Sequence, residues 1–130
     1  MALVVDKYIN VLMDNPNDTD AGVLVRNGDT IDITVTGSVW SGVIFTGTNG
    51  PGGWGGWSAS NDAVLPGAPP FSALLHTAAD GYHFMGSGLR ETYQNATLGP
   101  GETELSFMIN HDPTSRMGNG SFLVHLVVFR

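Results

Sequence analysis

The sequence predicts an all-β protein, a single-domain β-sandwich of the jelly-roll type. Residues 29–39, 103–109 and 121–129 alternate apolar with polar side chains, as strands with one buried face do. Glycine makes up 18 of the 130 residues, and turn signals recur at the short spacing that is typical of sandwiches. No long window shows a convincing helical period.

The first third of the chain divides into strands and turns. Residues 3–13 are rich in β-branched and aromatic side chains, which favours a strand. Residues 14–22 hold so many Asn, Asp and Gly residues that we expect a loop. A short strand at 23–25 then reaches the turn signal Asn27-Gly28. The strand that follows this turn is expected to continue through 39–45.

The rest of the chain alternates loops with short strands. Residues 46–56 form a glycine-rich loop, and the proline-rich segment 65–70 forms a second, stiffer loop. The remaining strands are expected at 71–76, 82–85, 91–98, 103–109 and 121–129. In the last strand we expect inward side chains at Phe122, Val124, Leu126 and Val128, with His125 outward.

Length and charge exclude several classes of function. A chain of 130 residues corresponds to one domain, 1–130. Its formal net charge of −7 argues against binding to nucleic acid or to an anionic membrane. The absence of cysteine excludes disulfide scaffolds and Cys-ligated zinc.

Localisation and assembly are predicted from apolar segments and charge density. No apolar stretch is long enough to span a membrane, and the start lacks the positive region of a signal peptide. We therefore expect a protein that is cytoplasmic or released by a non-classical route. Charged residues make up only 13% of the chain, which favours buried contacts between copies and hence a homo-oligomer.

The sequence does not predict an enzyme. Its serines and histidines show no nucleophile-elbow or metalloprotease motif. The three glutamates lie in turn or edge contexts, where a solvated face is the expected role.

Two loops carry candidate binding residues. Residues 110–120 offer the carboxylate of Asp112, the amide oxygens of Asn110 and Asn119, and backbone carbonyls. Calcium takes six to eight such oxygens, although an ordinary hairpin loop has the same composition. Trp54 and Trp57 lie in the glycine-rich loop, where they either stack on a sugar or a partner, or fold back over the sandwich.

Several short motifs occur in order along the chain. They are Asn27-Gly28-Asp29-Thr30-Ile31-Asp32-Ile33, Gly37-Ser38-Val39-Trp40-Ser41-Gly42, Asn49-Gly50-Pro51, Ile109-Asn110, and Gly120-Ser121-Phe122-Leu123-Val124-His125-Leu126. Together they resemble the LecA-type (PA-IL family) galactophilic, calcium-dependent bacterial lectins.

The resemblance implies a non-catalytic lectin with a galactose-binding-domain-like jelly roll. It would bind galactose-type or related sugars with the assistance of calcium, and it would be an oligomer. The implied calcium ligands are Asp112, Asn119, Asn110 and the carbonyl of Ser41. The residues expected to contact sugar are Trp54, Trp57, His111, Asp112 and Asn119.

The chain departs from the family in the metal loop. Asn110-His111 stands where the family has Asn-Asp, and the acid is displaced to Asp112. Asn119 still follows the acid by seven residues, as in the family, but Gly120 replaces a second Asn. The alternative to a lectin is a sugar-free structural or protein-interaction module that retains the fold. The expected partner is thus a carbohydrate or glycoconjugate, with no nucleic acid and no membrane insertion.

Overall fold

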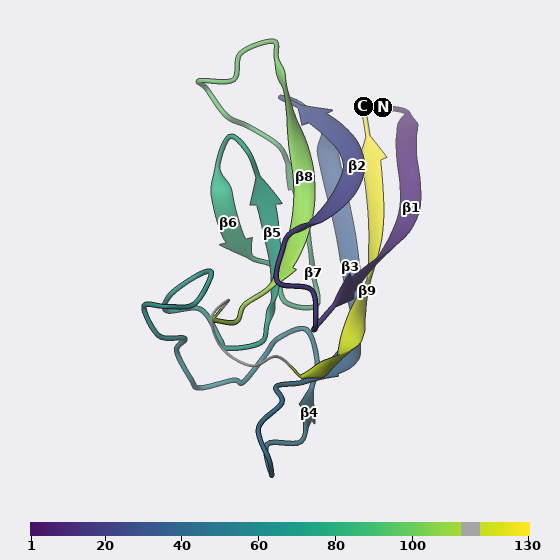
Figure 1. Cartoon of the computed structure of the whole chain (residues 1–130). Coiled ribbons are helices and arrows are strands. Elements are labelled where there is room, and N and C mark those ends of the chain that lie inside the picture. The colour runs from purple at the N-terminus through teal and green to yellow at the C-terminus, as the bar shows by residue number, and fades with distance from the viewer. Residues whose placement is uncertain (113–117) are drawn as a thin grey trace.

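The computed structural model describes residues 1–112 and 118–130, which form nine strands in two antiparallel sheets packed face to face (Figure 1). The strands are β1 (Leu3–Leu12), β2 (Thr19–Arg26), β3 (Thr30–Trp40), β4 (Thr48–Asn49), β5 (Ala73–Thr77), β6 (Gly81–Phe84), β7 (Gly88–Thr92), β8 (Glu102–Ile109) and β9 (Asn119–Phe129).

The two sheets differ in the number and order of their strands. In the first sheet, β9 lies between β1 and β3, and the far edge of β3 pairs with β7 along one half and with β4 at its end. The second sheet has the order β2-β8-β5-β6. The predicted all-β sandwich is therefore confirmed. Among the described residues, no helix has the length and apolar character needed to cross a membrane.

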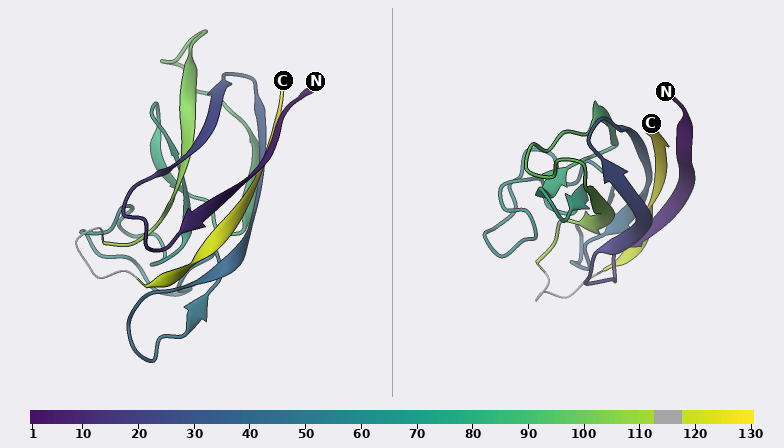
Figure 2. Two further views of the ribbon diagram at one scale, coloured as in Figure 1. Left: turned by 45° about the vertical axis from the view of Figure 1, so that its right-hand side comes forward. Right: turned by 90° about the horizontal axis from the view of Figure 1, so that it is seen from above.

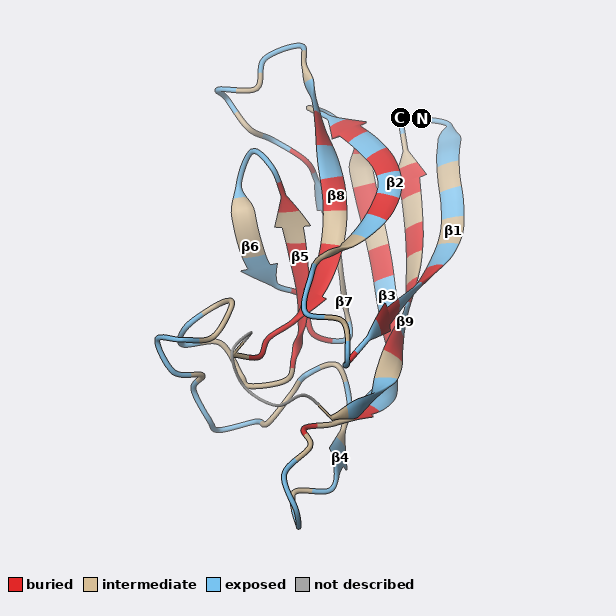
Figure 3. Ribbon diagram, viewed as in Figure 1, coloured by how far each residue is buried: buried red, intermediate tan, exposed pale blue. Residues whose placement is uncertain are grey.

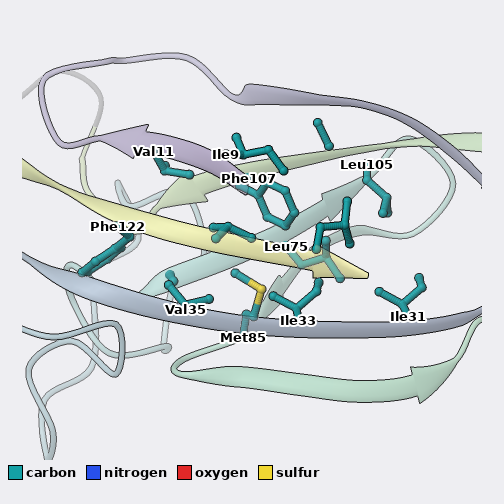
Figure 4. Packing of buried hydrophobic residues seen from close by; sticks show 14 of the residues in the cluster. Ile9, Val11, Ile31, Ile33, Val35, Leu75, Met85, Leu105, Phe107 and Phe122 are labelled. Carbon is teal, nitrogen blue, oxygen red and sulfur yellow. The ribbon is translucent and has the colours of Figure 1, made fainter. Parts of the chain in front are cut away.

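The core fills the space between the sheets because apolar side chains alternate along the strands. Buried and exposed residues alternate along β2, β8 and β9 (Figure 3). The expected inward residues of the last strand are all buried, and His125 lies on the outer face. Figure 4 shows side chains from both sheets meeting in one layer, with Phe107 and Phe122 among the largest fully buried ones.

Long-range pairing shifts one predicted boundary. β2 begins at Thr19, inside the segment 14–22 that was expected to be a loop. Thr19 and Asp20 pair with Phe107 and Ser106 of β8, and a bulge follows in which Gly22 has φ of 68°. Turn-rich composition is therefore overridden here by the neighbouring strand.

The expected continuation of a strand through 39–45 is wrong. β3 ends at Trp40 because the next residues close a tight turn. Ser41 Oγ accepts a hydrogen bond from the Val43 amide at 3.2 Å, and Thr46 Oγ1 donates to the Val43 carbonyl at 2.7 Å. The glycine-rich loop that follows contains the two-residue strand β4.

The strand expected at 91–98 is also displaced, because β7 covers Gly88–Thr92. Tyr93 then donates its amide to the Asp29 carbonyl at 2.7 Å, and Asn95 Oδ1 accepts the Thr97 amide at 2.9 Å. These contacts turn the chain away from the sheet. The other strands lie within two residues of their expected positions.

The two ends of the sandwich differ. The chain termini lie side by side at one end, where the Ala2 amide donates to the Arg130 carbonyl at 2.6 Å. The long segment between β4 and β5 lies at the opposite end (Figures 1 and 2). This second end carries the loops that the sequence marks for binding.

Candidate functional site

A hollow of about 200 Å³ lies between the β4–β5 segment and the residues that follow β8. It brings together the predicted residues Asn110, His111 and Asp112. Its other described lining residues are Ser58, Ala59, Ser60, Ala63, Pro70 and Phe71. The hollow therefore joins two segments that are far apart in the sequence, and both carry polar side chains.

Asn110 builds one wall of the hollow by holding the proline-rich loop. Its side-chain oxygen accepts the Leu65 amide at 2.9 Å, and its Nδ2 donates to the Leu65 and Pro69 carbonyls at 3.0 and 3.2 Å. Its backbone pairs with Phe71 and Ser72 at 2.7 and 2.9 Å. A buried amide with these partners fixes the loop against the end of β8.

His111 is the most unusual residue of the hollow. Its side chain is 4% exposed, and its backbone carbonyl accepts the Val64 amide at 3.1 Å. Within the described part of the chain, neither ring nitrogen has a hydrogen-bond partner. Buried polar groups are nearly always hydrogen-bonded, so an imidazole with two covered and unpaired nitrogens beside a hollow calls for a partner that the described residues do not supply.

Aromatic side chains gather at and beside the hollow. Phe71 lines the hollow, and Trp54 packs behind it with ring centroids 4.9 Å apart. Trp57 meets Trp54 edge to face at 6.4 Å and remains 68% exposed. The two alternatives expected for these tryptophans are divided between them, because Trp54 folds back against Phe71 while Trp57 faces solvent.

Phe71 was not singled out by the sequence. Its φ of 59° lies in the left-handed region, which a bulky residue rarely adopts. Backbone strain of this kind gathers at functional sites. The Pro69-Pro70 pair before Phe71 was the available signal, because prolines restrict the chain that delivers the next residue.

Ser41 and Asn119 lie together at the ends of β3 and β9, because Asn119 pairs with Trp40. The Ser41 hydroxyl is buried and bonds to Thr46 Oγ1 at 2.8 Å, while Asn119 is exposed. Neither residue is among the described residues that line the hollow. Their roles at a metal or a sugar stay predictions.

The described residues do not by themselves fit a calcium shell. No three His, Cys, Asp or Glu side chains gather among them, and the Asn110 amide is engaged with the proline-rich loop. His111 presents nitrogen, whereas calcium prefers oxygen ligands. The carbonyls of residues 113–117, which the sequence also offered to calcium, lie outside the described residues. Asp112 lies half-buried at the hollow.

A second polar cluster on the β2-β8-β5-β6 sheet has the composition of a catalytic triad but not its geometry. His76 Nδ1 lies 3.0 Å from Ser106 Oγ and 3.2 Å from Asp18 Oδ2. A proton relay needs the serine and the aspartate on different ring nitrogens, and here both meet the same one. Tyr82 donates to Asp18 at 2.7 Å, and burial followed by this contact raises the pKa of Tyr82 to about 12. The cluster therefore holds strands together.

Comparisons with known proteins give a fold match. No protein-family model and no curated protein sequence matches the chain. Among solved structures, it is similar to the N-terminal domain of EclA, described as a PllA-like lectin, with a TM-score of 0.62 over 95% of this chain and 97% of that chain. The identity is 17%, so the likeness concerns the fold. The chain therefore has the β-sandwich fold of a lectin domain.

Proposed function

We propose that the hollow beside His111 binds carbohydrate and that the protein acts as a non-catalytic lectin. The unpaired, buried imidazole of His111 is the observation that carries this proposal. A sugar hydroxyl both donates and accepts hydrogen bonds, so it can pair with a ring nitrogen in either tautomer once the covered ring turns toward the hollow. The lectin fold of the structural neighbour supports the same function.

The residues around His111 supply the other contacts that a sugar needs. Phe71 offers an apolar face for the C–H groups of a pyranose ring, and the exposed Trp57 extends the aromatic surface beyond it. Ser58, Ser60 and Asp112 can bond further hydroxyls. A hollow of about 200 Å³ accommodates one sugar residue at most, which is a shallow site. Binding to cells would therefore depend on several sites acting together.

The ligand class that we propose is galactose-type or related sugars, because the sequence resembles the LecA-type lectins. Recognition through His111, Phe71 and the hydroxyls needs no metal. Calcium assistance remains a prediction, because the described residues alone do not assemble its ligands.

The experiment is a glycan array with the wild-type chain and the variant His111→Phe. Phenylalanine keeps the ring volume but removes both unpaired nitrogens, so sugar binding should be lost while the melting temperature stays the same or rises. His83→Gln, at an exposed histidine outside the hollow, is the matched control and should bind as the wild type does. A His111→Phe variant that keeps the wild-type array signal would remove the basis of the proposal.

One observation favours the alternative, a protein-interaction module. The turn after β3 exposes three consecutive apolar residues, Val43, Ile44 and Phe45, and Phe45 is fully exposed with φ of 69°. Apolar patches of this kind occur at contact surfaces. An array without any signal, together with association that depends on Phe45, would favour this module over the lectin.

A further inference from the structure

A cavity larger than the hollow lies apart from it. Its volume is about 380 Å³, and it opens between the two sheets where β6 and β7 form their edges. The short connection from Phe84 to Gly88 joins these two edge strands across the sandwich. No residue that lines the hollow also lines this cleft.

The floor of the cleft is the hydrophobic core itself. Ile31 of β3 and Leu75 of β5 come from the facing sheets and are 0% and 3% exposed (Figure 4). Leu89 and the 48% exposed Phe84 continue this apolar surface toward solvent. An entering apolar group would therefore be buried mainly against Leu89 and Phe84, and it would reach Ile31 and Leu75, which are covered, only where the edges of the sandwich part.

Polar groups meet on one side of the cleft and are held in place by their neighbours. The Asp80 carboxylate accepts hydrogen bonds from Tyr93 Oη at 2.7 Å, Thr77 Oγ1 at 3.0 Å and Asn95 Nδ2 at 2.7 Å. A carboxylate has about four accepting positions, so these three donors leave room for one more. The carboxylate is thus positioned before any ligand arrives.

The protonation states of Asp80 and Tyr93 are also fixed. The hydrogen bond from Tyr93 holds the pKa of Asp80 below its ordinary value, against the opposing effect of burial. Burial raises the pKa of Tyr93 to about 12. Asp80 is therefore an anion at neutral pH, and Tyr93 is a neutral donor.

The charge of the cleft selects the sign of its ligand. Glu91 of β7 adds a second carboxylate, and the described lining contains no lysine or arginine. His83 is the one lining residue that can carry a positive charge, and it is exposed. An apolar floor of this volume with a few convergent polar groups is the usual form of a small-molecule site.

We propose that this cleft binds small amphipathic organic ammonium ions, with the apolar tail against Leu89 and Phe84 and the cationic head at Asp80 and Glu91. The cation completes the accepting positions of Asp80, and the tail fills the gap between the sheets. This site is separate from the sugar site and independent of the function proposed for it.

The test is calorimetry and NMR titration of the full chain with three probes of one length, hexylammonium, hexanol and hexanoate. We expect the ammonium ion to bind most tightly, the alcohol about tenfold more weakly, and the carboxylate not at all, because only the head group changes. Amide shifts should gather at Leu89, Glu91 and Tyr93. Equal binding of all three probes, or no binding, would contradict the proposal.

Two variants, each read against a control, separate the charge from the shape of the cleft. Glu91→Gln should weaken hexylammonium two- to fivefold, roughly the effect of one exposed charge, and should leave hexanol unchanged. Leu89→Trp should fill the cleft and abolish both. Glu104→Gln, an exposed glutamate of β8 outside the cleft, is the matched control. His111→Phe should leave hexylammonium binding unchanged, so failure at one site does not imply failure at the other. If Glu91→Gln and Glu104→Gln behave alike, the head group does not bind where we place it.

Discussion

At Gly118 the backbone passes so close to the end of β3 that no side chain fits. A Cβ atom at this position would overlap the Trp40 carbonyl and lie 2.5 Å from the Gly42 amide nitrogen. These are backbone atoms of a paired strand and a tight turn, and they cannot move aside. Gly118 therefore fixes where the chain rejoins the sheet beside the candidate site.

Gly118→Ala should therefore destabilise the protein by about 2 kcal/mol or more, the cost of forcing atoms into a packed region. Gly52→Ala is the control, because a Cβ there meets nothing within 4 Å and its backbone is not left-handed. Chemical denaturation of both variants measures the difference. Equal stability of the two would show that the chain relaxes at Gly118 without cost.

Asp29 is a buried carboxylate at the turn before β3. Arg130 binds it with two nitrogen atoms, each 3.0 Å from a carboxylate oxygen, and the Arg26 amide donates to it at 3.1 Å. Burial alone would raise the pKa of Asp29, but these hydrogen bonds and the positive charges of Arg130 and Arg26 outweigh burial. The pKa consequently lies below its ordinary value of 3.8.

This lowered pKa predicts a pH dependence of stability. The contribution of ionised Asp29 to the stability of the fold is complete above its unfolded pKa of 3.8. It is lost as the pH falls through the lower pKa of the folded state. Asp29→Asn should melt below the wild type at neutral pH, and the gap should narrow below about pH 4. Melting curves across this range measure it. A difference in melting temperature that stays constant with pH would mean that folding does not lower the pKa of Asp29.

At the scale of elements, the proline-rich loop depends on one residue of another segment. The Asn110 amide accepts one hydrogen bond from Leu65 and donates to the carbonyls of Leu65, Ala68 and Pro69. No regular secondary structure spans this loop, so the amide takes the place of a strand partner. The wall of the hollow is therefore set by Asn110 together with Ala59, which pairs with Gly67 and Ala68, and Ser72, which donates to the Pro69 carbonyl.

Asn110→Ala should destabilise the protein by about 1–2 kcal/mol, because it leaves part-buried backbone groups of the loop without their partner. Sugar binding should also fall, because Phe71, which lines the hollow, comes directly after the loop that Asn110 holds. Asn61→Ala, at an exposed asparagine of the same segment, is the control. Hydrogen exchange of the Leu65 amide locates the effect. An exchange rate that stays slow in Asn110→Ala would contradict this role.

Sequence patterns predicted most elements because alternation along a strand reports burial directly. β3, β8 and β9 each bury one face, so period two is visible in their residues. Thr19 could not be placed, because its strand is created by β8, which lies far away in the sequence. The end of β3 could not be placed either, since the hydroxyls of Ser41 and Thr46 close a turn that has apolar residues.

The candidate site was predictable only in part, because long-range contacts build some of it. His111 and Asp112 were indicated by their loop, and the structure places both at the hollow. Phe71 and the serines were not, because the hollow forms only when Asn110 draws a segment 45 residues away against the end of β8. The Pro69-Pro70 pair marks a restricted chain before Phe71, but nothing local to Leu65 reports that contact.

At the scale of the whole molecule, calcium and assembly remain predictions. If calcium is bound, it stabilises the fold by mass action, about 2.7 kcal/mol at a hundredfold excess over the dissociation constant. The melting temperature should then fall in a chelator, and Asp112→Ala should remove this difference, while Asp62→Ala, at an exposed acid, should keep it. One melting temperature in both buffers would contradict a structural calcium ion. A homo-oligomer is expected from the low charge of the chain.

The proposed carbohydrate site is the hollow beside His111. An NMR titration of the isotope-labelled protein with galactose, followed through the backbone amides and the His111 ring, tests it. Saturable shifts are expected at Ser60, Phe71 and His111, including the imidazole resonances, and none are expected in the His111→Phe variant. Shifts confined to other parts of the sandwich, or no shift up to saturating sugar, would contradict it.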